Sequence, residues 1–133
     1  MTKRYWLTPP DLYERLNAEF GFTFDPCPYP LPEGHNGLEM PWGAVNYVNP
    51  PFRRKDAVGK NAGPTAFVHK AIAEAKLGKT SVLVLPGQSY FMLGLENGAE
   101  LRSAGRVKFL EVETREPYKS PSAIFTMIFR GKP

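Results

Sequence analysis

The sequence predicts a single α/β domain with a mostly parallel β-sheet. Apolar runs typical of strands alternate along the chain with segments of helical periodicity, and this alternation favours parallel strands joined by helices. The run at residues 81–85 is apolar throughout, as in strands that are buried on both faces. The length of 133 residues suits one domain, residues 1–133, with little room for a second.

The first helix is expected to begin after Thr8, because threonine is a frequent N-cap and the two following prolines suit a first helical turn. Apolar residues then recur at helical spacing as far as Phe20, and Gly21 is the expected stop. Residues 22–24 follow as a short strand. Alternate prolines over residues 26–32 exclude both helix and central strand, so a stiff extended loop is expected there.

A second strand is expected over residues 44–48. Pro64 opens an amphipathic helix that ends at Gly78, and the buried strand 81–85 comes next.

The C-terminal third is expected to contain a weaker helix over residues 91–104, which Gly94 and Gly98 interrupt. An edge strand over residues 106–110 and a last strand over residues 123–129 complete the prediction.

Composition limits the classes of function. The net charge of +4 and the pI of about 9.3 fit a polyanionic partner. The one cysteine, Cys27, excludes an intramolecular disulfide. No run of about 20 apolar residues could span a membrane, and the N-terminus lacks the apolar region of a secretory signal. A cytoplasmic protein without a membrane partner is therefore expected.

The tetrapeptide Asn49-Pro50-Pro51-Phe52, directly after a strand, is the strongest chemical signal. An amino nitrogen conjugated with a nucleobase ring is a poor nucleophile. The Asn49 side-chain oxygen and the Pro50 carbonyl can accept hydrogen bonds from its two protons and favour a tetrahedral nitrogen, while the prolines hold both acceptors rigidly. Phe52 offers a flat face for an extruded base. The alternative is a simple turn at a strand end.

Two unusual loops are expected at one edge of the sheet, because Asp25-Pro26 and Asn49-Pro50 both follow strands. Ligands of open α/β sheets bind beyond the carboxyl ends of the strands, so the two loops predict a shared site. A basic cluster follows the tetrapeptide. Its side chains either contact DNA phosphates near a flipped base or form a solvated loop; they are Arg53, Arg54, Lys55 and Lys60.

The tetrapeptide resembles the Asp/Asn/Ser-Pro-Pro-Tyr/Phe/Trp motif of amino-methyltransferases, and the chain most closely resembles the small phage-type, Dam-like DNA adenine methyltransferases. The resemblance covers nearly the whole chain. Its further matching segments are Trp6-Leu7-Thr8-Pro9, Phe24-Asp25-Pro26-Cys27, Asn36-Gly37-Leu38 with Trp42, Val82 to Pro86 with Phe91, and Ser120-Pro121-Ser122-Ala123.

The resemblance implies a reduced Rossmann-like methyltransferase fold with an antiparallel C-terminal strand. It implies methyl transfer from S-adenosylmethionine to the exocyclic amino group of adenine in DNA, without a metal, in the host cytoplasm if a phage encodes the chain. The tetrapeptide would hold the target base. The residues implied at the cofactor are Trp6, Thr8, Pro9, Asp25, Pro26, Cys27, Asn36 and Gly37.

Two departures from the family pattern concern the cofactor. The first cofactor loop is usually rich in glycine, whereas residues 27–30 contain none, and Asn36 stands where an aspartate is common. The nearby carboxylates for the ribose hydroxyls are Glu33 and Glu39. His69, Tyr90 and Phe91 are further candidates for the site, with surface or core positions as the alternatives.

Two other functions remain open. The tetrapeptide also marks RNA and protein-glutamine methyltransferases, although the latter usually carry tyrosine at the last position. A methyltransferase fold that binds DNA or a partner subunit without catalysis is the second alternative. No target-recognition domain fits into the chain, so specificity would come from loops, a homodimer or a partner. A zinc site at Cys27, His35 and His69 is disfavoured, because these residues lack paired spacing.

Overall fold

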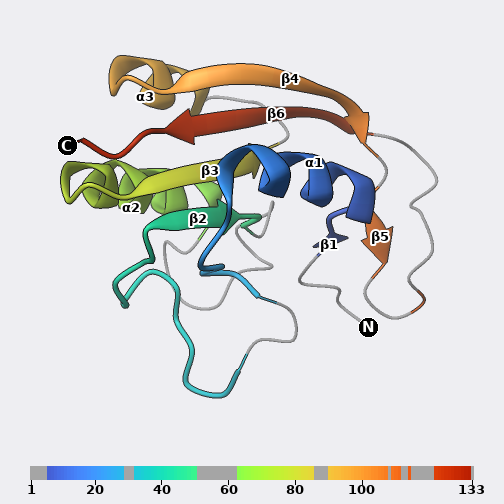
Figure 1. The fold of residues 1–133 in the computed structure, drawn as a ribbon, viewed down its shortest axis with the longest axis horizontal. Helices are drawn as coiled ribbons and strands as arrows, with labels where there is room; N and C mark the ends of the chain where they lie inside the picture. The colour runs from blue at the N-terminus through green and yellow to red at the C-terminus, as the bar shows by residue number, and fades with distance from the viewer. Residues whose placement is uncertain are drawn as a thin grey trace.

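The computed structural model describes residues 6–28, 32–50, 63–85, 90–107, 109–111, 114 and 122–132. A four-stranded sheet lies between helix α1 (Pro10–Phe20) on one face and helix α2 (Pro64–Lys76) on the other (Figure 1). The short helix α3 (Tyr90–Glu96) packs on the same side as α2. Within these residues, none of the helices has the length and apolar character that crossing a bilayer would need.

The sheet has the strand order β2-β3-β6-β4. The bounds of its strands are β2 (Val45–Val48), β3 (Thr80–Leu85), β4 (Glu100–Val107) and β6 (Ser122–Phe129). Strands β2 and β3 are parallel, and β6 runs antiparallel to both β3 and β4. Strands β2, β3 and β4 therefore share one direction, which confirms the α/β class and the antiparallel last strand. A separate two-stranded sheet pairs β1 (Trp6–Leu7) with β5 (Leu110–Glu111).

Strand β3 contributes side chains to both hydrophobic cores, one on each face of the sheet. Its residues alternate between the faces of the sheet, so Val82 and Val84 pack in the α1 core, while Leu83 and Leu85 pack in the α2 core. All four are fully buried. Each such side chain contributes roughly 1.5–3 kcal/mol through its burial, which explains why the run is apolar without alternation.

The helix boundaries agree with the sequence analysis at Gly21 and Pro64, but the start of α1 differs. Pro9, not Thr8, precedes the helix, and no side chain caps it. The Thr8 hydroxyl instead hydrogen bonds to the hydroxyl of Tyr47 on β2. The expected strand at residues 22–24 is reduced to one parallel bridge between Phe24 and Asn46.

The prediction of a helix over residues 91–104 was wrong for the second half of this range. Helix α3 ends at Glu96, and Gly98 turns the chain with a φ of +83°, a conformation that favours glycine. From Glu100 the chain pairs with β6 instead of continuing the helix. The edge strand expected at residues 106–110 therefore begins earlier, as β4, and β5 follows it.

Candidate functional site

One parallel bridge brings the two unusual loops together. Phe24 pairs with Asn46, and the Tyr47 amide donates to the Phe24 carbonyl at 3.0 Å. Asp25, the residue after Phe24, therefore lies toward the edge of the sheet at which β2 ends. Asn49 follows β2 at this same edge. The expected convergence of the two loops at one carboxyl edge is confirmed.

The segment before α1 reaches the same edge through Tyr47. The Tyr47 hydroxyl bonds to that of Thr8, and the Tyr13 ring meets the Tyr47 ring edge-on, with centroids 4.9 Å apart. Burial raises the pKa of Tyr47 well above its usual range, so its hydroxyl stays neutral. Tyr47 was not among the site residues predicted from the sequence. The available signal was a tyrosine inside an apolar strand, because a buried hydroxyl needs a partner.

Asp25 is a largely buried carboxyl group at this edge. The Cys27 amide donates to its Oδ1 at 2.8 Å. Burial raises the pKa of Asp25 to about 6, and the Cys27 hydrogen bond and the charge of His35 oppose this shift only in part. Within the described part of the chain, no lysine or arginine forms an ion pair with Asp25. Burial therefore leaves its ionised form poorly solvated.

Cys27 contributes its backbone to the site, not its thiol. The side chain is buried in the α2 core, and burial raises the pKa of the thiol well above its usual range. His35 Nε2 lies 2.8 Å from the Pro26 carbonyl oxygen. Among the described residues, no group of three or more histidine, cysteine or acidic side chains could hold a metal ion.

Gly37 allows close packing against the Asp25-Pro26 turn, which has no glycine of its own. A Cβ atom at Gly37 would lie 2.2 Å from the Pro26 carbonyl oxygen, so the two backbones touch only because residue 37 is glycine. The Asn36 side chain accepts a hydrogen bond from the Leu38 amide at 3.0 Å. The Asn36–Leu38 segment thus packs directly against the Asp25-Pro26 turn.

Gly37→Ala is expected to destabilise the fold by about 1–3 kcal/mol, because the added methyl group forces the two backbones apart. Thermal unfolding measures the effect. Gly34→Asn is the control: a Cβ there meets nothing within 4 Å, and asparagine tolerates the φ of +77°. Equal stability of Gly37→Ala and the wild type would contradict the close packing of Gly37 on Pro26.

Two asparagines of the β2 segment have different environments. Asn46 is fully buried, and its amide group bonds to Gly43 and to the Thr80 carbonyl. Asn49 is half-buried just beyond the strand, and Pro50 is buried. Asn46 therefore holds the strand, while Asn49 lies at the edge. The other predicted residues here, Pro51, Phe52, Arg53, Arg54, Lys55 and Lys60, lie outside the described residues.

A cleft of about 630 Å³ lies between Leu38 and the first turns of α2. It joins the Asn36–Leu38 segment to the helix that follows the tetrapeptide. Of its lining residues, His69 was the one considered as a site candidate from the sequence. Its lining residues are Leu38, Gly63, Pro64, Thr65, Ala66, His69 and Lys70.

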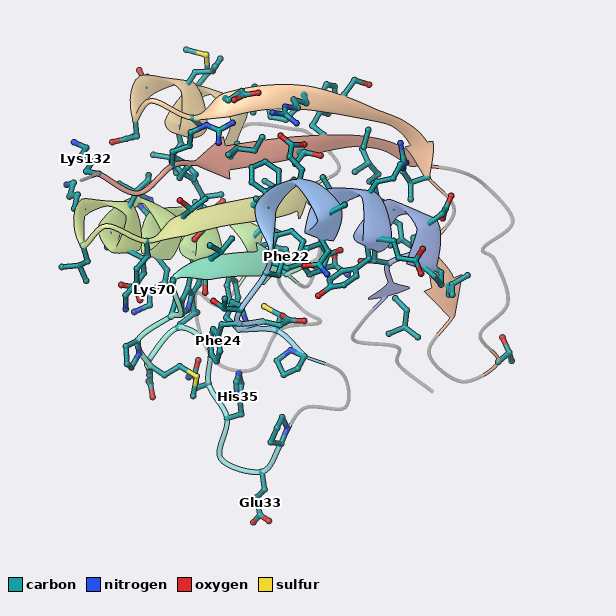
Figure 2. All side chains as sticks on the ribbon, viewed as in Figure 1. Phe22, Phe24, Glu33, His35, Lys70 and Lys132 are labelled. Atoms are coloured by element: carbon teal, nitrogen blue, oxygen red, sulfur yellow. The ribbon has the colours of Figure 1, made fainter. Side chains whose placement is uncertain are left out.

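The remaining candidates are divided between surface and core. Glu33 lies at the outer tip of its loop, away from the sheet, and Glu39 is exposed (Figure 2). The Phe91 ring packs edge-on against Phe125 with centroids 4.6 Å apart, beside the α2 core. The Trp6 backbone pairs with Glu111 in β1, but its side chain and that of Tyr90 are outside the described residues.

Comparisons of the chain with protein-family models, curated proteins and solved structures find no match in any of the three.

Proposed function

We propose that this protein is an S-adenosylmethionine-dependent methyltransferase that modifies the exocyclic amino group of adenine in DNA. The observation that carries the proposal is the convergence of three segments at one carboxyl edge. Thr8-Pro9 reaches this edge through Tyr47, Asp25-Pro26 through the bridge from Phe24, and Asn49-Pro50 by following β2. These are the segments whose motifs resemble the Dam-like family, and this is the edge where α/β sheets bind ligands.

The sheet supports the same proposal. Strands β2, β3 and β4 share one direction, and the C-terminal strand β6 is inserted antiparallel between β3 and β4. A reduced Rossmann-like methyltransferase sheet with an antiparallel last strand has this form. The parallel pair β2 and β3 ends at the candidate site.

The residues at the edge fit the cofactor's charge. S-adenosylmethionine supplies the methyl group and carries positive charge on its sulfonium and ammonium groups. The poorly solvated Asp25 carboxylate would bind such a cation. The Thr8 hydroxyl, which is hydrogen bonded to the Tyr47 hydroxyl, belongs to the same edge of the sheet. The cleft beside Leu38 is within the size range of small-molecule pockets and could take the nucleoside portion.

Asn49 and Pro50 would then hold the target base. The Asn49 side-chain oxygen and the Pro50 carbonyl would accept the two amino protons, which directs the nitrogen lone pair at the incoming methyl group. Buried Pro50 limits the motion of both acceptors. Phe52 would stack on the flipped base.

Calorimetry with S-adenosylmethionine, followed by a methyl-transfer assay on DNA with and without adenine, tests the proposal. We expect cofactor binding and adenine-dependent methylation. A folded protein that binds no cofactor, with or without DNA, would contradict the enzyme and support a binding module. Cofactor binding with transfer to RNA or a glutamine side chain instead of DNA would change the substrate class.

Replacing Arg53, Arg54 and Lys55 by glutamine is expected to weaken DNA binding and flatten its salt dependence. Each lost phosphate contact removes about one released counterion from the slope of log K against log salt. Fluorescence anisotropy over a salt series measures the slope. The control, Lys76→Gln with Lys132→Gln, removes charge near the far ends of α2 and β6. An identical slope in both variants would argue against phosphate contacts in the basic cluster.

A further inference from the structure

We propose that Glu74 of α2 is a positioning residue that holds the loop of residues 36–42, hereafter the 36–42 loop, in the geometry that cofactor binding needs. The proposal rests on the proposed function for the identity of the ligand. Its structural part, a path of contacts from Glu74 to the Asp25-Pro26 turn, can be tested without any cofactor.

Glu74 is a buried carboxylate with three partners. Its side chain is 3% exposed, and its Oε1 accepts a hydrogen bond from the Trp42 amide at 2.6 Å. The Lys70 and Lys79 Nζ atoms lie 3.6 and 3.8 Å from the same oxygen. A buried ion pair is often no more stabilising than a well-packed apolar side chain. Stability alone therefore does not account for a buried hydrogen-bond acceptor at this position.

Trp42 carries the restraint from Glu74 to the candidate site. It is 3% exposed, and its ring lies beside the Phe67 ring. Its backbone amide is bound to Glu74, and its indole Nε1 donates to the Gly37 carbonyl at 2.7 Å. Gly37 in turn packs on the Pro26 backbone. Three consecutive contacts thus link α2 to the turn that carries Asp25.

The Glu74 carboxylate contacts one residue in each of the two segments that line the cleft, Lys70 in α2 and Trp42 in the 36–42 loop. Lys70 lines the cleft on α2, and Leu38 lines it on the 36–42 loop, between Gly37 and Trp42 in sequence. Figure 2 shows Lys70 on α2, and His35 just before this loop. Glu74 and Lys70 belong to the same helix, so the bond from Glu74 to the Trp42 amide is the contact that ties the loop wall of the cleft to the α2 wall.

Three variants separate positioning from simple stability. Glu74→Ala removes the acceptor, Glu74→Gln keeps an acceptor oxygen for the Trp42 amide, and Trp42→Phe keeps the backbone bond but removes the indole donor. We expect Glu74→Ala to raise the KM and Kd for S-adenosylmethionine about tenfold or more, with kcat at saturation unchanged. Glu74→Gln should stay within about threefold of wild type, and Trp42→Phe should be intermediate.

Hydrogen exchange without cofactor gives an independent readout. In Glu74→Ala, we expect faster exchange at the Trp42 indole N–H and the Leu38 amide, as well as at the Trp42 amide itself. Faster exchange confined to the Trp42 amide would overturn the proposal, because the restraint would not extend along the loop. A wild type that binds no cofactor overturns the proposed function, and the exchange pattern still decides whether Glu74 positions the loop.

Ile128→Ala is the matched control. Ile128 is buried in the α1 core on the opposite face of the sheet, so its truncation should lower the melting temperature without changing the KM for cofactor. If Ile128→Ala raises the KM as much as Glu74→Ala does, or if Glu74→Gln fails to rescue affinity, Glu74 has only a structural role.

Discussion

Asn49→Ala is expected to lower the rate of methyl transfer by at least about 10²-fold, the usual cost of removing one polar group that stabilises a transition state. The variant loses one of the two acceptors for the adenine amino protons. Its stability should stay within about 1 kcal/mol of wild type, because Asn49 is only half-buried and lies just beyond the end of β2. Single-turnover methylation at saturating cofactor and DNA measures the effect on the chemical step.

Two variants control this result. Asn49→Asp keeps an acceptor oxygen and matches the family motif, so it should retain activity. Asn46→Ala should show the opposite pattern, with a lower melting temperature but near-normal turnover in the cold. It leaves the Gly43 amide and the Thr80 carbonyl without their side-chain partner, at about 0.5–1.5 kcal/mol for each of these half-buried groups. Wild-type activity in Asn49→Ala would exclude Asn49 from catalysis.

The elements that could be predicted are those that local sequence determines. Gly21 caps the end of helix α1 and Pro64 begins α2, as glycine and proline geometry favour. Strand β3 is buried on both faces, as its apolar run indicates. The boundary between α3 and β4 was missed, because β4 owes its existence to pairing with β6, which the periodicity of residues 91–104 does not reveal.

The site could be predicted as far as parallel pairing determines it. Asp25-Pro26 and Asn49-Pro50 lie at one edge because the strands that precede them run in one direction. The contacts that complete the site join residues distant in sequence. Thr8 and Tyr47 are 39 residues apart, and Trp42 and Glu74 are 32 apart. Neither pair forms a local pattern, so only the folded chain reveals them.

Asp25→Asn is expected to stabilise the fold while it weakens cofactor binding. Burial raises the pKa of Asp25 to about 6 in the folded protein, above its ordinary value of 3.8. Burial therefore penalises the ionised form by about 2–3 kcal/mol at pH 7, an upper estimate for a partly solvated group. Asparagine removes this penalty, and its side-chain oxygen can still accept a hydrogen bond from the Cys27 amide. It cannot attract a cation, so the Kd for S-adenosylmethionine should rise roughly 10- to 100-fold.

The dependence on pH separates a functional carboxylate from a structural one. Because the folded pKa is raised, the stability that Asp25 contributes is fully present below pH 4 and is lost as pH rises through about 6. Wild-type cofactor affinity should fall over the same range as pH decreases, and Asp25→Asn should lack both dependences. Calorimetry and thermal unfolding between pH 5 and 7.5 measure them, with Asp11→Asn, an exposed carboxyl in the first turn of α1, as the charge-matched control. If Asp25→Asn lowers the melting temperature and leaves the Kd unchanged, Asp25 supports the loop through its bond to the Cys27 amide instead of binding the cofactor.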